Sequence, residues 1–131
     1  MADSILSVGN CGYDNGQLGR LLAGICDHLV QTAHTADEAL ALAADCRLVL
    51  VNRVFDRTGE SGVEFVRRVK ELHPEVPVML ISNYADAQAA AEAAGAMPGF
   101  GKSELGDSAL LDRLRAVLCS DDSAKGQDED E

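Results

Sequence analysis

Aromatic residues are scarce in this sequence, and tryptophan is absent. The 131 residues include two Tyr, three Phe and no Trp. Proteins that bind single-stranded nucleic acid stack bases on aromatic side chains, so this composition argues against that class. Positive charge is also in short supply, because the net charge is −11. The last eleven residues, with six acids and one lysine, carry −5, which leaves −6 for the other 120. Since an acidic surface repels phosphate backbones and anionic lipid, we expect no nucleic acid and no membrane among its partners.

The sequence has four cysteines but no Cys-x-x-Cys pair and no secretory signal. Its N-terminus, Met-Ala-Asp-Ser, has no basic segment followed by an apolar run. We therefore expect reduced thiols in a cytoplasmic protein rather than two disulfides. No window approaches the roughly 18 apolar residues that a membrane span needs. The cysteines are Cys11, Cys26, Cys46 and Cys119.

Motifs for metals and phosphates are missing as well. His28, His34 and His73 lack the spacing of metal ligands. The glycine-containing loop at residues 9–12 lacks the lysine and serine of a phosphate-binding motif. The sequence therefore predicts no metal site and no cofactor.

Apolar runs give the pattern of strands and helices. Residues 48–51 and 78–81 are all aliphatic or methionine, which is typical of strands buried on both faces of a parallel sheet. Weaker patterns predict strands at residues 4–8, 28–33 and 98–101. Apolar residues at helical spacing predict helices after a cap at Asp14 or Asn15, from Thr35 to about Ala44, over 62–72, over 86–94, and from a cap at Asp107 or Ser108 to residue 118.

Two capping boxes support the helix assignments. In residues 35–38 and 61–64, a hydroxyl at the first position and a carboxylate at the fourth can each accept from a free backbone amide. Five strands alternating with five helices on short loops predict a three-layer α/β/α sandwich around a five-stranded parallel sheet, in the flavodoxin-like order 2-1-3-4-5. We expect one domain over residues 1–120 and an acidic, disordered tail over residues 121–131.

Asn52 stands at the carboxyl end of the strand predicted at 47–51, where ligands gather in open α/β sheets. Four other segments follow it in a fixed order: Gly62-Val63-Glu64-Phe65-Val66, Pro77-Val78-Met79-Leu80-Ile81-Ser82, Ala94-Gly95-Ala96, and Lys102. In this order, over roughly residues 4–118, the chain resembles the receiver domain of bacterial two-component response regulators.

The resemblance implies which groups a phosphorylated receiver needs at its strand ends. These are an acceptor aspartate, an acidic pair that holds Mg²⁺, and a hydroxyl and a lysine that bind the phosphoryl oxygens. By position, Ser82 and Lys102 retain the hydroxyl and the lysine. Asn52 stands at the acceptor position, and Gly9 and Asn10 stand at the acidic pair. A carboxamide is not a competent nucleophile, and a site without these carboxylates binds Mg²⁺ poorly.

The chain departs from the family pattern at further positions. Asp56 ends the pair Phe55-Asp56, which replaces the usual Met-Pro, and Ser103 replaces the proline after the lysine. Gly99 stands at the position of an aromatic switch, with Phe100 one place later. Because a shift of one residue in a strand reverses the face, the resemblance does not extend to a conventional aromatic switch.

Simpler interpretations of the same residues remain open. Asn52 can be a loop cap whose amide bonds nearby backbone. Ser82 and Lys102 are either a vestigial pair or an anion-binding pair, or Lys102 forms a salt bridge with Asp56. Asp56 itself is either a solvated loop acid or an alternative phosphate acceptor.

Our hypothesis is an atypical receiver domain that is not an enzyme and acts, without phosphorylation, as a protein-interaction module. Its partner would be a sensor kinase-like protein, a downstream effector, or a second copy bound through the helix at 86–94, the strand at 98–101 and the last helix. One alternative is a receiver phosphorylated at Asp56. Another is a flavodoxin-like enzyme that binds a small anion beside Lys102.

Overall fold

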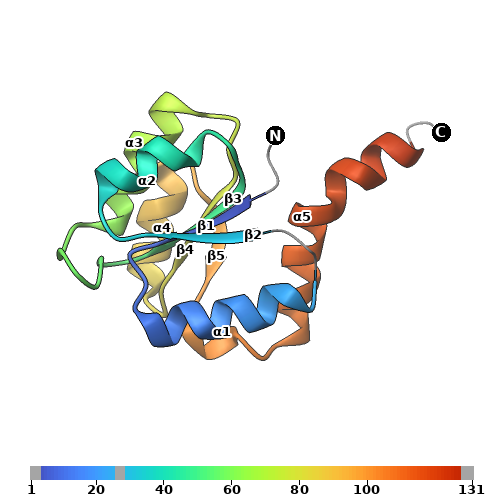
Figure 1. Cartoon of the computed structure of the whole chain (residues 1–131), viewed down its shortest axis with the longest axis horizontal. Helices are drawn as coiled ribbons and strands as arrows, with labels where there is room; N and C mark the ends of the chain where they lie inside the picture. The colour runs from blue at the N-terminus through green and yellow to red at the C-terminus, as the bar shows by residue number, and fades with distance from the viewer. Residues whose placement is uncertain (1–3, 26–28, 128–131) are drawn as a thin grey trace.

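A parallel five-stranded sheet in the order β2-β1-β3-β4-β5 forms the centre of the computed structural model (Figure 1). The order is the one predicted from the sequence, and it places the ends of β1 and β3 side by side. The structure describes residues 4–25 and 29–127, with side chains over 4–25 and 30–118. The strands are β1 (Ser4–Val8), β2 (Leu29–Ala33), β3 (Cys46–Asn52), β4 (Val78–Ile81) and β5 (Met97–Phe100).

Helices cover both faces of the sheet, so that the chain forms the expected three layers (Figure 1). On one face, Leu18 of α1 and Leu114 of α5 pack in the same buried cluster as Leu50 of β3. On the other face, α2, α3 and α4 cover the sheet. The helices are α1 (Gly12–Ala23), α2 (Ala36–Ala43), α3 (Gly62–Leu72), α4 (Ala85–Ala93) and α5 (Ser108–Gln127), with a short 3-10 helix η1 (Lys102–Glu104).

Each capping box is present in its forward half. Thr35 accepts from the backbone amide of Glu38 at 3.1 Å, and Ser61 accepts from that of Glu64 at 3.2 Å. In the first box the reciprocal bond differs from the prediction, because the carboxylate of Glu38 accepts from the backbone amide of His34 instead of that of Thr35. Both helices still begin where the boxes place them.

The start of α1 differs from the prediction. The helix begins at Gly12 with Cys11 as its cap, and the sulfur of Cys11 accepts from the backbone amide of Asp14 at 3.5 Å. Asp14 and Asn15, the two predicted caps, therefore lie inside the first turn. The reason is local, because the side chain of Asn15 bonds instead to Ser7 and to the backbone oxygen of Asn10.

The last helix extends beyond its predicted end at residue 118. Helix α5 continues to Gln127, seven residues into the segment that the sequence analysis assigns to a disordered tail. No proline interrupts residues 108–127, and the first glycine comes only at Gly126, so nothing in this stretch forces the helix to end earlier. Residues 128–131 of the expected tail lie outside the described residues.

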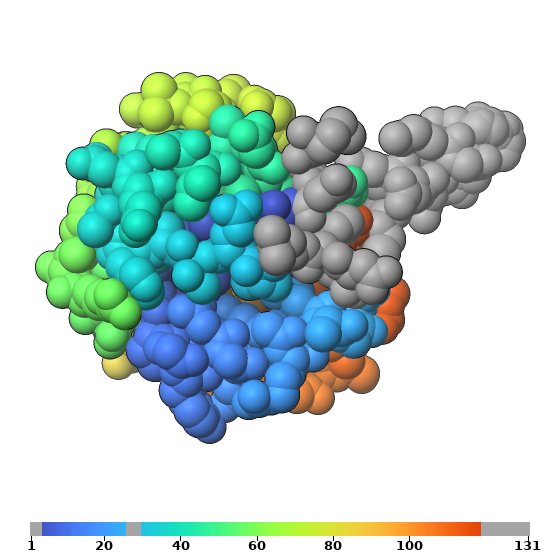
Figure 2. All heavy atoms as spheres, viewed as in Figure 1, coloured from blue at the N-terminus to red at the C-terminus, as the bar shows by residue number. Residues whose placement is uncertain are grey.

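Two further features concern the edge of the sheet and the apolar character of the helices. Strand β2 is one edge of the sheet and reaches the surface between α1 and α2 (Figure 2). Within residues 4–25 and 29–127, no helix combines the length and the apolar character needed to cross a bilayer.

Candidate functional site

A cavity of about 500 Å³ opens at the carboxyl ends of β3 and β4. It brings together three of the predicted site residues, Asn52, Ser82 and Lys102. Gly9, Asn10 and Asp56 are not part of its wall. The full lining consists of Asn52, Arg53, Val54, Ile81, Ser82, Asn83, Tyr84 and Lys102.

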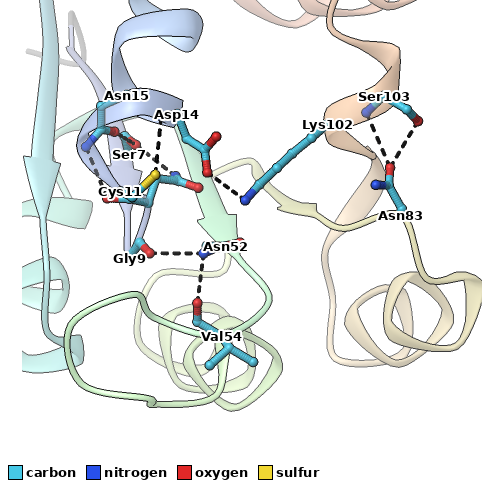
Figure 3. A network of polar contacts seen from close by, with 11 residues as sticks. Ser7, Gly9, Cys11, Asp14, Asn15, Asn52, Val54, Asn83, Lys102 and Ser103 are labelled. Carbon is cyan, nitrogen blue, oxygen red and sulfur yellow. Dashed lines mark hydrogen bonds and ion pairs between the residues drawn. The ribbon is translucent and has the colours of Figure 1, made fainter.

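The amide of Asn52 is occupied by backbone bonds. Its nitrogen donates to the carbonyl oxygens of Gly9 at 3.1 Å and of Val54 at 2.7 Å (Figure 3). Both amide protons are therefore used to join the loop after β1 to the loop after β3. A carboxylate in this place would face two carbonyl oxygens with no proton between them. The geometry fits the interpretation of Asn52 as a loop cap.

Gly9, at the first position of the expected acidic pair, has no room for a side chain. Its φ of +73° lies in the left-handed region that disfavours other residues, and an added Cβ would stand 2.5 Å from a ring carbon of Phe55. Phe55 is itself fully buried, with its ring edge against that of Phe65 at a centroid distance of 5.9 Å. The ring of Phe55 therefore fills the space that a side chain at position 9 would need.

Asn10, at the second position of the pair, does not line the cavity. Its side chain is 1% exposed, and its amide nitrogen donates to the hydroxyl of Ser7 at 2.9 Å. That hydroxyl in turn donates to the side-chain oxygen of Asn15 on α1. The amide oxygen of Asn10 has no hydrogen-bond partner among the described residues. Asn10 thus connects β1 to α1 through a buried polar chain.

These positions do not fit the Mg²⁺ that the resemblance implies. Asn52, Gly9 and Asn10 supply no carboxylate, and Mg²⁺ binds preferentially to charged oxygen. Over the part of the chain that the structure describes, no group of three or more His, Cys, Asp or Glu residues is placed to hold a metal ion.

Lys102 pairs with an acid that the sequence analysis missed. Its ammonium nitrogen lies 2.6 Å from a carboxylate oxygen of Asp14, across the gap between η1 and the first turn of α1 (Figure 3). The alternative salt bridge with Asp56 was wrong. Asp56 is exposed, and its backbone amide donates to the carbonyl of Gly9. Because helix N-termini and strand ends share one edge of the sheet, an acid in the first turn of α1 was the available clue to this pair.

Ser82 and its neighbours line the same cavity as Asn52. Ser82 is 8% exposed, and its hydroxyl accepts from the backbone amide of Tyr84 at 3.0 Å. The side-chain oxygen of Asn83 accepts from the hydroxyl of Ser103 at 3.1 Å, which fixes the loop after β4 to η1 (Figure 3). Across the mouth of the cavity, the Arg53 guanidinium lies 4.7 Å from the ring centroid of Tyr84.

Gln88 on α4 occupies the region of the expected aromatic switch. Its amide nitrogen lies within hydrogen-bonding distance of three carbonyls, those of Leu80 at 2.9 Å, Ser82 at 3.0 Å and Phe100 at 3.3 Å. A Cβ at Gly99 would stand 2.1 Å from the Leu80 oxygen and 2.7 Å from the Gln88 side-chain oxygen.

The backbone explains why no aromatic side chain can stand at Gly99. Residues 97 and 100 of β5 pair with residues 79 and 81 of β4, so β5 carries one extra residue between the two pairs. This irregularity brings Gly99 against the β4 backbone and buries Phe100 in the cluster shared with α1 and α5. Sequence reasoning placed Gly99 and Phe100 but missed Gln88, because its partners are backbone oxygens.

The two cysteines with described side chains are unpaired thiols. Cys11 caps α1, and Cys46 is buried. Burial, with a smaller contribution from Asp45, raises the pKa of Cys46 to about 11, so this thiol stays protonated at neutral pH. These two residues fit the expectation of reduced cysteines. The side chains of Cys26 and Cys119 lie outside the described residues.

No protein-family model and no curated protein matches the sequence. Among solved structures, NtrX from Brucella abortus superposes with a TM-score of 0.76 and 28% identity, over 98% of this chain and 29% of NtrX. The chain therefore spans less than a third of that protein. The receiver domain of the same NtrX gives a TM-score of 0.72 and 27% identity, over 88% of this chain and 98% of the domain.

A third structure has the same fold at lower identity. A response regulator from Burkholderia pseudomallei, solved with a phosphorylated aspartic acid, a calcium ion and citrate, gives a TM-score of 0.66 and 21% identity. The superposition covers 98% of this chain and 75% of that one. The fold, the strand order and these neighbours agree with the motifs found in the sequence. The chain has the fold of the receiver domains of response regulators.

Proposed function

We propose that this chain is an atypical response regulator receiver domain that signals through protein contacts without phosphorylation. The observation that carries the proposal is the Asn52 amide, which donates to the carbonyls of Gly9 and Val54. A carboxamide held in this way has no anionic oxygen, and phosphoryl transfer to a side chain needs one as the nucleophile.

The surroundings of Asn52 support the same proposal. An acyl phosphate forms when a cation offsets the charge of the phosphoryl oxygens. The position of one expected acid is filled by the Phe55 ring, and Asn10 at the other is neutral and buried under α1. The ammonium of Lys102 is already paired with Asp14. We infer that the site has kept its shape while its chemistry has been lost.

The surface of α4, β5 and α5 is the proposed contact for a second copy, and the partner protein is a sensor kinase-like protein or a downstream effector. In α4, Ala91 is the one fully buried residue, so most of this alanine-rich helix is available at the surface. Strand β5 lies at the edge of the sheet beside it. We further propose a reducing, cytoplasmic setting, which the unpaired thiols of Cys11 and Cys46 fit.

Incubation with acetyl phosphate and Mg²⁺, followed by intact-mass measurement, tests the proposal. We expect no adduct of one phosphoryl group on this chain. The Burkholderia pseudomallei response regulator, which has been solved with a phosphorylated aspartic acid, is the positive control for the reagent. A stoichiometric adduct on this chain under conditions that label the control would overturn the proposal.

Phosphorylation at Asp56 is the runner-up function. The side chain of Asp56 is exposed in the loop after β3, outside the wall of the cavity that holds Ser82 and Lys102. An adduct that forms on the wild-type chain and disappears in Asp56→Asn would establish this alternative. A small-anion enzyme remains the third hypothesis, and it would require turnover that depends on Lys102.

A further inference from the structure

We propose that the cavity beside Asn52 binds a carboxylate side chain of a partner protein, followed by an apolar side chain that enters the adjoining groove. The inference rests on the proposed function, because it names the partner chemistry of the interaction module and the surface that receives it. It assigns the strand-end face, rather than the α4–β5–α5 surface, to an acidic peptide segment.

The charge of the cavity is opposite to that of the chain. Its wall contains two cations, Arg53 and Lys102, and no acid. The whole sequence has 22 acidic residues against 11 Lys and Arg. A cleft lined by one sign of charge concentrates the electric field within it. This cavity therefore attracts an anionic group, which the remaining acidic surface would repel.

Arg53 is the group that selects the anion. Over the side chains that the structure describes, no carboxylate pairs with Arg53. Its guanidinium lies instead over the ring of Tyr84, which holds the cation in one place. The N–H donors of a guanidinium match in geometry the two oxygens of a carboxylate. An arginine that has no salt-bridge partner and is already held in place loses little conformational freedom when it binds a carboxylate.

Lys102 contributes a second, weaker contact. Asp14 accepts one hydrogen bond from its ammonium at 2.6 Å, and an ammonium has three N–H donors. The remaining donors can reach an incoming oxygen, but Asp14 already offsets the charge. Loss of Lys102 should therefore weaken binding less than loss of Arg53.

The adjoining groove, a hollow of about 680 Å³, shares Arg53, Val54 and Tyr84 with the cavity. Val63 and Ala87 add to its apolar lining, and Val54 and Tyr84 are large side chains that are 40% and 61% exposed. Tyrosine and arginine are the residue types that most often dominate interface energies. Asp86 also lines the groove and repels a second acid there. The fitting peptide therefore presents one acid next to an apolar residue.

A random dodecapeptide display library, selected on the full chain, tests the inference. We expect the selected sequences to be enriched in Asp or Glu beside an apolar residue. The best peptide, synthesised with a fluorophore, should bind Arg53→Ala about tenfold more weakly than the wild type, and Lys102→Met severalfold more weakly. Arg20→Ala is the matched control, because Arg20 is an exposed arginine of α1 that lines neither the cavity nor the groove, and it should bind unchanged.

The outcomes separate this inference from the function on which it rests. Selected peptides without acidic enrichment, equal binding by Arg53→Ala, or no selected peptide at all would overturn it. Saturation by inorganic phosphate with no acidic peptide selected would assign the cavity to a free anion instead and would also overturn it. A chain that takes up no phosphoryl group from acetyl phosphate while failing these tests leaves the proposed function standing.

Discussion

Asn52 at the end of β3 and Gln88 on α4 are both neutral amides whose nitrogen donates to backbone carbonyls, but they connect different parts of the sheet. Asn52 joins the loops that follow β1 and β3, and it lies on the wall of the cavity. Gln88 reaches from a helix to the oxygens of Leu80, Ser82 and Phe100. Its own side-chain oxygen is buried without a partner among the described residues.

Asn52 concerns the chemistry of the site, and Gln88 concerns the movement of a side chain. At Asn52 a neutral group stands where the family resemblance expects the charged acceptor. Near Gly99, where the resemblance expects a mobile aromatic residue, a glutamine fixes α4 to β4 and β5 instead. The two replacements use the same functional group at separate positions, with no shared hydrogen bond. Each can therefore be removed without directly removing the other.

The largest effect is expected for Gly9→Asp, on the Asn52 side of this comparison. A left-handed φ and the contact with the Phe55 ring should together lower the free energy of unfolding by about 3–4 kcal/mol. Urea denaturation measures the loss. Gly12→Asp is the control, because nothing lies within 4 Å of its added Cβ and an acid in the first turn of α1 is favourable. Equal stability of the two variants would show that the place of the first acid is not filled.

Gln88→Met, on the Gln88 side of the comparison, should have the next largest effect. Methionine keeps the length of the side chain but removes the amide donor that faces three carbonyls, of which the Phe100 carbonyl still accepts from the backbone amide of Ser82. We therefore expect a loss of about 2–3 kcal/mol. Chemical denaturation gives the value, and amide hydrogen exchange in β5 should accelerate. Glu92→Ala, at an exposed position of the same helix, should change stability by less than about 0.5 kcal/mol. Full stability of Gln88→Met would mean that Gln88 holds nothing in place.

Asn52→Asp should have the smallest effect. Its carboxylate would face the carbonyls of Gly9 and Val54, at a cost of about 1–2 kcal/mol near neutral pH. Protonation returns one donor, so the loss should shrink as the pH falls, which thermal unfolding at several pH values can follow. The variant should still take up no phosphoryl group from acetyl phosphate, because Gly9 and Asn10 supply no carboxylate for Mg²⁺. Ready phosphorylation would show that these two residues are misassigned to the acidic pair.

The sequence predicted the fold well because its apolar runs leave few choices. Residues 48–51 and 78–81 form buried strands, and the hydroxyls of Thr35 and Ser61 start α2 and α3 as expected. Helix α5 extends beyond its predicted end at residue 118, since no proline and no glycine before Gly126 interrupts it. The cap of α1 was assigned to a favoured residue type, and the structure uses the sulfur of Cys11 instead.

The site was predicted only in part, because the contacts that were missed depend on how distant segments are placed in space. Asn52, Ser82 and Lys102 meet because parallel strands end at one edge of the sheet. The pair of Lys102 with Asp14 joins residues 88 positions apart and leaves no local pattern. Gln88 bonds to backbone oxygens, which every residue has. Contacts of these two kinds depend on how the loops and α4 are placed in space.

The Phe55 ring also sets the order in which substitutions at position 9 can be tolerated. A carboxylate at Gly9 requires the ring to be removed first, since the two would occupy the same space. Phe55 is fully buried against Phe65, and truncating a buried phenylalanine costs about 3–5 kcal/mol, a large share of the roughly 5–15 kcal/mol that stabilises a domain. Introducing a carboxylate at position 9 and truncating Phe55 are therefore each expected to cost a large share of the stability of the chain, so neither change is tolerated easily without the other.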